Sequence, residues 1–363
     1  MAEEMITVTG DLQFEAWRQK VLPPVEEVRP SVWSIPVPFP NNPMRYTLCY
    51  ALIGEDAGSG SVVVVDPGWA SAEGWEALTQ GLAIAGVSTE AVSGIVVTHL
   101  HPDHLGLASR LRTASGAWVA LGEQEVLPSG WAADADKHAI KDAERYRNWG
   151  VPADRLREVT FGAADWAQMA RMQEPQLRLI DGAYVPAAGL RLRVIATPGH
   201  TPGHICLFDE KNNLLLTGDH ILPRITPHIS LEMHSPINPV ADYLSSLDVL
   251  ENLQRQDANT ALEVLPAHEY RFDGLSQRLA ELRQHTLARS AEVQSVINSG
   301  TARNVWDVAS KLTWSRGFDS LGSFALRLAM AETASHLVYL QSQGAGLDFQ
   351  ITEVPEALVT GAE

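Results

Sequence analysis

The sequence predicts a layered α/β protein, and three observations lead to this prediction. Two aliphatic stretches, SVVVV at 61–65 and SGIVVTH at 93–99, have the composition of strands that are buried on both faces. Segments with helical spacing of apolar residues alternate with such strands along most of the chain, which favours a layered α/β architecture. A chain of 363 residues with 45% hydrophobic content is also long enough to bury a large core.

The first third of the chain supplies strands and helices in turn. In order, we expect short strands within 31–67, a helix at 72–85, a strand at 93–99, a helix at 105–115 that Gly116 ends, and a strand at 117–121. Pro- and Gly-rich stretches separate the early strands and mark the turns between them.

Residues 123–176 change character and are expected to form a helical insertion. They carry the charged stretches KHAIKDAERYRNWG and DWAQMARM, together with Trp131, Trp149 and Trp166. One interpretation is a lid over a cleft, because pockets are lined with apolar and aromatic groups. The alternative is that the Trp side chains anchor a helical pair to the core. The position of the insertion between two motifs described below favours the lid.

Strands resume after the insertion, and the chain ends in helices. The expected strands are LRLRVIATPGH at 190–200, HICLFDE at 204–210, NLLLTGD at 213–219 and LEVLPAHEY at 262–270, with a helix at 241–253. After about residue 274, helical spacing returns for three helices. We therefore divide the chain into a domain of residues 1–274, which includes the insertion, and a helical domain of residues 275–363.

Composition excludes several classes of protein. Lys and Arg number 27 against 44 Asp and Glu, and the resulting charge of −17 disfavours nucleic acid as a partner. The first twenty residues contain acids and no apolar run of signal-peptide length, and no stretch of eighteen apolar residues occurs. We therefore expect a cytoplasmic protein with no membrane partner. Cys49 and Cys206 provide neither a disulfide framework nor a cysteine-based metal site.

The strongest chemical signal is THLHPDHLG, which follows the strand at 93–99. It places His99, His101, Asp103 and His104 within six positions, where the end of a rigid strand can direct several short side chains to one point. Imidazole nitrogen and carboxylate oxygen are ligands that zinc prefers, and a catalytic zinc site also keeps a position open for water. The motif therefore predicts a catalytic metal site.

Three further ligand-type residues end later strands in the same way. They are His200 in ATPGHTPGH, Asp219 in LLTGDH and His268 in LPAHEY. A lone histidine is usually a core or surface residue, but seven ligand-type residues at four strand ends are unlike a chance distribution. Two adjacent cations would lower the pKa of a shared water and polarise a substrate oxygen, and Asp103 could orient the resulting hydroxide and accept its proton.

These motifs resemble those of the metallo-β-lactamase superfamily, in which a His-x-His-x-Asp-His loop precedes a third His, a bridging Asp and a final His. The resemblance covers roughly residues 31–270, and all seven positions match. It implies an αββα sandwich of two mixed sheets, with helices outside and the metals at one edge. It also implies that His99, His101 and His200 hold one metal, that Asp103, His104 and His268 hold the other, and that Asp219 bridges them.

The resemblance extends to other residues and to the tail. Asp66 in VVDPG is similar to an Asp that supports metal ligands, with a plain turn residue as the alternative, and His204 is similar to a supporting His of the glyoxalase II type. His220 is ambiguous, while His228 and Tyr270 either face substrate or pack. The tail resembles the winged-helix-like domain of the β-lactamase-like protein 2 group, and we expect it to pack or to form a homodimer.

The resemblance implies a metal-dependent hydrolase with two zinc ions per chain, iron and manganese being alternatives. The leading hypothesis is cleavage of a small-molecule thioester, ester or lactone, since PGHTPGH and TGDH resemble hydroxyacylglutathione hydrolase. The basic residues by which glyoxalase II grips glutathione have no counterpart in this tail. Alternatives are phosphodiester hydrolysis on RNA, which the acidic charge disfavours, a mono-iron oxygenase similar to persulfide dioxygenase, and β-lactamase activity.

Overall fold

The computed structural model describes residues 6–55, 61–126, 134–169, 174–231, 238–256, 262–347, 349 and 351. Its strands are β1 (Thr7–Val8), β2 (Glu26–Arg29), β3 (Val32–Pro38), β4 (Tyr46–Ile53), β5 (Val62–Val65), β6 (Val92–Val96), β7 (Trp118–Gly122), β8 (Leu177–Leu179), β9 (Leu192–Ala196), β10 (Ile205–Asp209), β11 (Leu214–Gly218), β12 (Glu263–Pro266) and β13 (Phe272–Asp273). The helices are α1 (Asp11–Gln19), α2 (Ala72–Ile84), α3 (Pro102–Leu105), α4 (Ala108–Ser115), α5 (Ala135–Asn148), α6 (Leu156–Val159), α7 (Ala163–Met169), α8 (Pro239–Gln256), α9 (Leu275–Asn298), α10 (Val305–Ala309) and α11 (Ser323–Ser342), with short 3-10 helices at Thr89–Ala91 and Phe318–Ser320.

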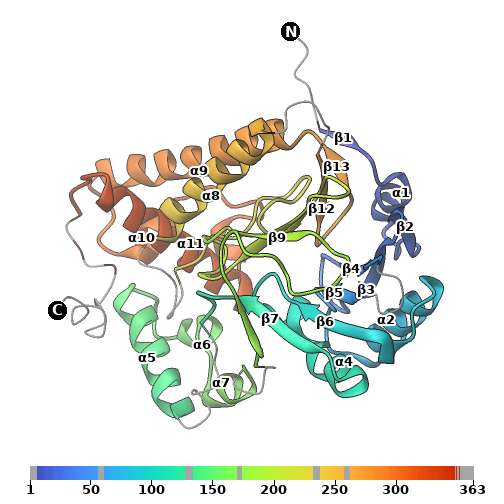
Figure 1. Cartoon of the computed structure of the whole chain (residues 1–363). Helices are drawn as coiled ribbons and strands as arrows, with labels where there is room; N and C mark the ends of the chain where they lie inside the picture. Colours follow the sequence, from blue (N-terminus) through green and yellow to red (C-terminus); the bar gives the residue numbers. More distant parts are fainter. Residues whose placement is uncertain are drawn as a thin grey trace, which may run out of the picture. The chain divides into compact units, whose positions relative to one another are not determined.

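The described strands form two sheets (Figure 1). A seven-stranded sheet has the order β2-β3-β4-β5-β6-β7-β8, and a six-stranded sheet has the order β1-β13-β12-β11-β10-β9. Both sheets are mixed: β5, β6, β7 and β8 run parallel, as do β11 and β12, and the other pairings are antiparallel. The predicted α/β architecture is confirmed.

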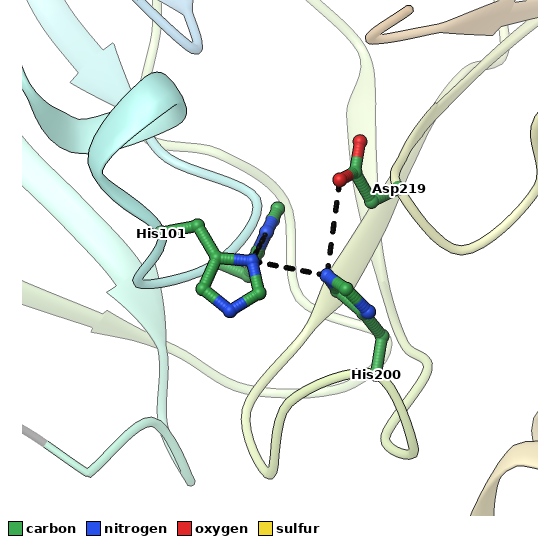
Figure 2. Close-up of side chains that lie close together, drawn as sticks. His101, His200 and Asp219 are labelled. Atoms are coloured by element: carbon green, nitrogen blue, oxygen red, sulfur yellow. Dashed lines mark hydrogen bonds and ion pairs between the residues drawn. The ribbon is translucent and has the colours of Figure 1, made fainter. Parts of the chain in front are cut away.

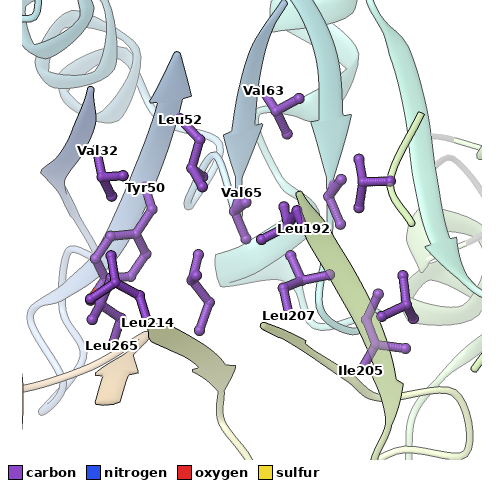
Figure 3. Packing of buried hydrophobic residues seen from close by; sticks show 14 of the residues in the cluster. Val32, Tyr50, Leu52, Val63, Val65, Leu192, Ile205, Leu207, Leu214 and Leu265 are labelled. Atoms are coloured by element: carbon purple, nitrogen blue, oxygen red, sulfur yellow. The ribbon is translucent and has the colours of Figure 1, made fainter. Parts of the chain in front are cut away.

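The core between the sheets follows from the alternation of side chains along each strand. Tyr50 and Leu52 of β4 and Val63 and Val65 of β5 point into a shared apolar cluster, and Leu207 of β10 meets them from the other sheet (Figure 3). The intervening residues of the same strands belong to a second cluster on the outer face of the seven-stranded sheet. The two clusters explain why β5 has valine at every position.

Helices cover the outer face of the seven-stranded sheet. Leu78 and Leu82 of α2 and Leu111 of α4 pack in the second cluster against residues of β3 to β7 such as Ile35 and Ile95. Gly81 of α2 allows this close approach, because a Cβ atom there would lie 2.3 Å from Ile35 Cγ2. The two sheets and these helices account for three layers of the predicted sandwich.

One expected helix is interrupted, and the interruption lies in the metal motif. The predicted helix at 105–115 is observed as α3 and α4, with Gly106 between them. A Cβ atom at Gly106 would lie 2.6 Å from the backbone nitrogen of Ala70 and 2.8 Å from the carbonyl oxygen of Gly68, so the chain passes too close for any larger residue. Gly116 ends α4 with φ 77°, as expected.

The contacts divide the chain into two compact units. The first contains Met1–Ser129, Met172–Pro227 and Asp242–Arg283, and the second contains Gly130–Arg171, His228–Ala241 and Gln284–Glu363. The helical insertion is therefore grouped with the C-terminal helices in the second unit. Trp149 is buried in the core of that unit, and its Nε1 donates to Ile351 O at 2.7 Å, while Trp131 lies outside the described residues.

A buried ion pair joins the two parts of the second unit. Arg327 of α11 binds both oxygens of Asp142 on α5, at 2.8 and 3.1 Å, and also donates to Val159 O at 2.8 Å. Its guanidinium lies 3.9 Å from the centre of the Phe161 ring. Because both charged side chains are almost fully buried, each compensates the charge of the other. No helix among the described residues is long and apolar enough to cross a membrane.

Candidate metal centre

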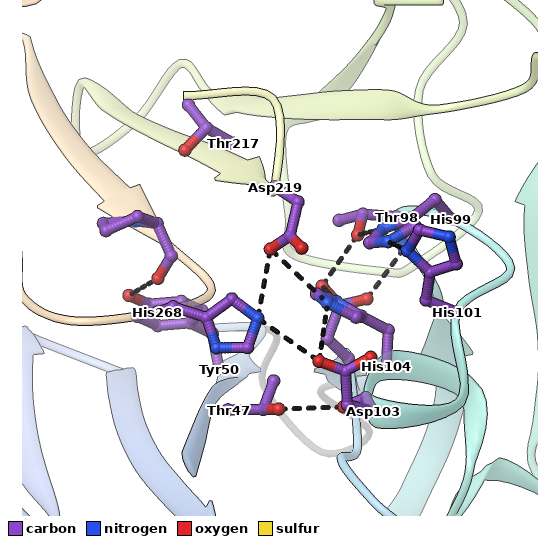
Figure 4. A network of polar contacts seen from close by, with 12 residues as sticks. Thr47, Tyr50, Thr98, His99, His101, Asp103, His104, Thr217, Asp219 and His268 are labelled. Carbon is purple, nitrogen blue, oxygen red and sulfur yellow. Dashed lines mark hydrogen bonds and ion pairs between the residues drawn. The ribbon is translucent and has the colours of Figure 1, made fainter. Parts of the chain in front are cut away.

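All seven sequence-predicted ligand residues lie within the first unit, in segments that directly follow strands. Asp103 and His104 belong to the short helix α3, and the other five lie in loops. Figure 4 shows all of them except His200. The segment after β6 carries the HLHPDH motif, and the segments after β9, β11 and β12 carry the other three residues. Because β6 belongs to one sheet and the other three strands to the second, the site lies where strand ends of the two sheets come together. The structure brings all seven side chains into two adjacent groups.

The first group contains His99, His101, His200 and Asp219, whose candidate ligand atoms all lie within 4.8 Å of one another. His101 Nδ1 is 2.7 Å from His99 Nε2 and 3.1 Å from His200 Nε2. His200 Nε2 is in turn 3.8 Å from Asp219 Oδ2 (Figure 2). Three imidazole nitrogens that face one point, beside a carboxylate, are a donor set suited to zinc.

The second group contains Asp103, His104 and His268, and it also meets Asp219. His268 Nε2 lies 3.3 Å from Asp103 Oδ2 and 3.2 Å from Asp219 Oδ1. His104 Nε2 lies 3.5 Å from the same Asp219 oxygen. Asp219 therefore presents one oxygen to each group, which is the placement that a bridging ligand requires.

Unpaired polar atoms show that the second group fits a cation. His104 Nε2, His268 Nε2 and Asp219 Oδ1 are buried and have no hydrogen-bond partner of acceptable geometry among the described residues. Buried polar atoms are usually satisfied, because an unsatisfied one costs roughly 1–3 kcal/mol. Three such atoms facing one another are explained if a metal ion is their common partner.

The electrostatics of the two groups differ. Burial, together with the neighbouring histidines, lowers the pKa of His101 to about 3 and that of His99 well below its usual value. Burial also opposes protonation of His268, but Asp219 and Asp103 outweigh it and raise the pKa of His268 to about 10. His99 and His101 thus stay neutral, the form in which imidazole binds a metal, whereas the carboxylates around His268 attract positive charge, proton or metal.

Asp66 supports the second group through His104. It follows β5 with φ 51°, and its Oδ2 lies 2.8 Å from His104 Nδ1. The same carboxylate accepts from Thr98 N at 2.7 Å and Thr98 Oγ1 at 2.8 Å. The hydrogen bond between His104 Nδ1 and Asp66 places the ring proton on Nδ1. His104 Nε2 is then free to bind a metal ion. This contact with His104 agrees with the interpretation of Asp66 as a supporting residue.

His268 is oriented by the backbone of the other sheet. Its Nδ1 donates to the carbonyl oxygen of Tyr46 at the start of β4, at 2.9 Å. Thr47 Oγ1 donates to the carbonyl oxygen of Asp103 at 2.9 Å. The first two residues of β4 therefore fix both a ligand side chain and a ligand-bearing loop.

Sequence reasoning missed Glu125, which lies just beyond β7 and is buried. Its Oε1 accepts from Leu100 N at 2.8 Å, between His99 and His101, and its Oε2 accepts from Thr201 Oγ1 at 3.0 Å and Gly203 N at 2.6 Å. The carboxylate therefore ties the two loops of the first group together. An isolated Glu in GEQEV carries no spacing signal that could have identified it.

The remaining candidates lie outside the two groups. His204 Nδ1 lies 2.8 Å from Thr197 Oγ1, which agrees with a supporting role, and His204 belongs to neither group. His220 is buried, and neither ring nitrogen has a hydrogen-bond partner in the part of the chain described. Tyr270 is buried and packs on the rings of Phe14 and Trp17. His228 pairs with Glu332 at 3.4 Å in the second unit.

Comparison with known proteins agrees with this fold and site. The sequence profile of the Metallo-beta-lactamase superfamily matches residues 44–268, which include every residue of both groups. The crystal structure of a metallo-beta-lactamase family protein from Thermus thermophilus is similar, with a TM-score of 0.70 and 29% identity, over 88% of this chain and 96% of that one. The chain belongs to the metallo-beta-lactamase superfamily. By its fold and its cluster of ligand-type residues it is a metal-dependent hydrolase.

Three other relatives match smaller parts of this chain. Acyl-coenzyme A thioesterase MBLAC2 of Gallus gallus is 26% identical over 62% of this chain and 73% of its own length. Hydroxyacylglutathione hydrolase of Ectopseudomonas mendocina (strain ymp) is 26% identical over 53% of this chain and 56% of its own length. A protein of Aquifex aeolicus (strain VF5) is 29% identical over 45% of this chain and 61% of its own length. The chain thus spans between 56% and 73% of the length of these three relatives.

Proposed function

We propose that the chain is a dinuclear metal-dependent hydrolase that cleaves the thioester, ester or lactone bond of a small molecule. The observation that carries the proposal is the convergence of seven ligand-type side chains, three of whose buried polar atoms have no other hydrogen-bond partner in the described structure. The donor set of imidazole and carboxylate, with no thiolate, suits zinc, and iron or manganese would accept the same ligands.

The two groups define the proposed ligands of each ion. His99, His101 and His200 would hold one cation, and Asp103, His104 and His268 would hold the other. Asp219 would bridge them, because its two carboxylate oxygens face different groups. When bound, the two cations would lower the pKa of a shared water towards neutrality and polarise the substrate oxygen.

The protein's own side chains perform the remaining tasks. Asp103 lies beside His268 and Asp219, and its pKa is lowered to about 2, because the attraction of His104 and His268 outweighs the effect of burial. It is therefore ionised at neutral pH and can accept a hydrogen bond from the attacking water. A pKa this low makes it a weak base, so it holds the proton of that water only in passing. Attack of water on a thioester yields a carboxylic acid and a thiol, and the proton held by Asp103 can pass to the leaving sulfur.

The thioester class is favoured by two relatives whose names describe thioester substrates. A phosphodiester substrate on RNA is disfavoured by the charge of −17, since polyanions bind to basic surfaces. A mono-iron oxygenase would need one ligand group, whereas this chain presents two complete groups.

A substrate panel tests the proposal. Purified protein would be offered an acyl thioester, a lactone, a β-lactam and a phosphodiester, before and after treatment with a chelator, and again after addition of zinc. We expect cleavage of the thioester or lactone that is lost on chelation and returns with zinc. Cleavage of the phosphodiester or the β-lactam alone would contradict the proposed substrate class, and hydrolysis that survives complete metal removal would contradict the proposed mechanism.

A further inference from the structure

A cavity of about 620 Å³ lies between the N-terminal helix and the turn that joins β3 to β4. It is lined by Trp17, Arg18, Lys20, Pro43 and Arg45. Its volume is within the range of sites that bind small organic ligands. Three of the five lining residues carry a positive charge, in a chain whose net charge is −17. The cavity is therefore a local basic site on an acidic protein.

Arg45 presents donors that have no acceptor. Its Nη2 donates to Trp17 O at 3.1 Å, but Nε and Nη1 are buried and have no hydrogen-bond partner among the described residues. Guanidinium nitrogens donate but cannot accept, and Nε and Nη1 point to different sides of this planar group, so each needs an acceptor of its own. Unsatisfied guanidinium donors beside a basic cavity favour an anionic ligand.

The backbone holds Arg45 in place. Arg45 has φ 68°, its N–H donates to Asn42 O at 3.0 Å, and its carbonyl accepts from Phe39 N at 2.7 Å. These bonds close the turn on both sides of the arginine. The side chain thus starts from a fixed backbone position, which lowers the entropy lost when a ligand binds.

The nearby acidic groups leave the cavity with excess positive charge. Arg18 pairs with Glu15 at 3.4 Å, and both side chains are exposed. Arg224 lies 4.1 Å from the centre of the Trp17 ring and 3.6 Å from Glu269 Oε1. Lys20 and Arg45 form no ion pair with the described acids, so an incoming anion does not have to displace a carboxylate from them.

Direct contacts link this cavity to the candidate metal centre. Arg45 immediately precedes Tyr46, whose carbonyl oxygen accepts the hydrogen bond of His268 Nδ1 at 2.9 Å. Trp17 meets the ring of Tyr270 edge on, with 5.7 Å between ring centres, and Tyr270 is two positions beyond His268. The cavity therefore lies beside the strand and the loop that hold His268.

We propose that this cavity binds the phosphate-bearing end of a thioester substrate of the coenzyme A type, while the thioester carbonyl lies at the metal centre. The inference rests on the proposed function and adds the substrate class. Arg45 supplies a positive charge and unsatisfied N–H donors, and Arg18 and Lys20 supply the surrounding positive charge. This site explains how a hydrolase without a basic tail can hold a polyanionic thioester.

Two substrates with the same acyl group test the proposal: the coenzyme A thioester and the uncharged N-acetylcysteamine thioester. In the holoenzyme, Arg18→Gln/Lys20→Gln removes two charges from exposed positions, which preserves the fold. Exposed charge pairs contribute roughly two- to fivefold each in binding. We therefore expect KM for the coenzyme A thioester to rise about tenfold, while kcat and the constants for the uncharged thioester stay within about twofold.

Arg255→Gln is the matched control, because Arg255 is an exposed arginine on α8, outside the cavity. It should change neither KM. Arg45→Lys provides a second probe: it keeps the charge but loses the guanidinium donors, so it should also raise KM for the coenzyme A thioester selectively. Equal effects on both thioesters, or no effect of the double variant on either, would overturn the proposal.

Binding without catalysis separates this proposal from the proposed function. Calorimetry would measure the Kd of S-ethyl coenzyme A, a thioether that cannot be hydrolysed, for wild-type holoenzyme and for Arg18→Gln/Lys20→Gln. We expect the Kd to rise about tenfold in the variant. If neither thioester is hydrolysed, the proposed function fails. The Kd then decides the cavity proposal by itself. An unchanged Kd in the variant would overturn that proposal as well, whereas a raised Kd would support the cavity as a phosphate site.

Discussion

Glu125 accepts a hydrogen bond from the backbone N–H of Gly203 at 2.6 Å, across 78 positions of sequence. Its other carboxylate oxygen accepts from Leu100 N, so a single side chain joins the loop of His101 to the loop of His200. Burial raises the pKa of Glu125, although these hydrogen bonds favour the ionised form. Gly203 has to be glycine, since a Cβ atom there would lie 2.0 Å from the backbone nitrogen of Glu125.

Glu125→Gln should weaken metal binding without unfolding the protein. The amide has nearly the same shape, but its NH2 group would face one of the backbone N–H donors and push the two loops apart. Losing a residue that positions metal ligands costs about 10- to 100-fold in metal affinity. We expect a loss of this size for zinc, measured by competition with a chelator of known affinity.

Glu210→Gln is the control for this variant, because Glu210 pairs with Arg191 and Arg193 instead of with a ligand-bearing loop. It should leave zinc affinity unchanged. If Glu125→Gln bound zinc as tightly as the wild type, Glu125 would have no part in positioning the ligands.

Asp219→Ala and His204→Ala should have unequal effects on hydrolysis. Asp219 contacts both ligand groups, so its loss should lower kcat by at least about a hundredfold and reduce the number of bound metal ions. His204 instead contacts Thr197, and its loss should reduce kcat by about tenfold with the metal content unchanged. Steady-state kinetics and elemental analysis would show both effects. Equal losses in the two variants would contradict the ligand assignment.

Arg327→Met should destabilise the second unit. It leaves the Asp142 carboxylate buried without its partner, which typically costs about 3–5 kcal/mol. The double variant Arg327→Met/Asp142→Asn should recover part of this loss, because an amide still accepts from Phe161 N and carries no charge. Urea unfolding followed by circular dichroism would measure both. A loss in the single variant of less than about 1 kcal/mol would show that the pair contributes little.

Stability should fall as the pH drops below about 6.5, in part through His336. Burial lowers its pKa to about 4, with the nearby Glu332 opposing the shift. Between pH 6.5 and 4 the unfolded chain binds a proton that the folded protein does not, so the free energy of unfolding decreases with falling pH. The loss reaches about 3 kcal/mol for one such group.

His336→Asn separates this effect from those of other groups. The amide can still meet Ser290 Oγ, which lies 2.9 Å from His336 Nδ1, but it does not titrate. Urea unfolding at about pH 7, 6, 5 and 4 should show a shallower decline in this variant. A wild-type slope retained in full would mean that His336 is not the titrating group.

The sequence predicted the convergence of the seven ligand-type side chains because each lies at the end of a recognisable strand. Such motifs are local, and the topology of the sheets then brings their ends together. Glu125 was not predictable, since its partners are backbone N–H groups whose positions depend on the fold. The cavity at Arg45 was missed for the same reason, because α1 and the turn after β3 meet only in the folded chain.

The grouping of the helices was also beyond the sequence. Helical spacing identified α5 and α11, but it gives no information on which neighbour a helix packs against. The partner of Arg327 is 185 positions away, and only the fold reveals that the pair is buried. The interruption of the helix at Gly106 could not be foreseen either, because its cause is the backbone of Gly68 and Ala70.

Elemental analysis of the purified protein, coupled to thioester hydrolysis, tests the central claim most directly. The two ligand groups predict about two zinc ions per chain, and hydrolysis that rises with metal content as a chelated sample is reloaded. The second group should also lose its ion in Asp219→Ala. One iron per chain with no hydrolysis of any thioester or lactone would contradict the account and favour oxygen chemistry at the first group alone.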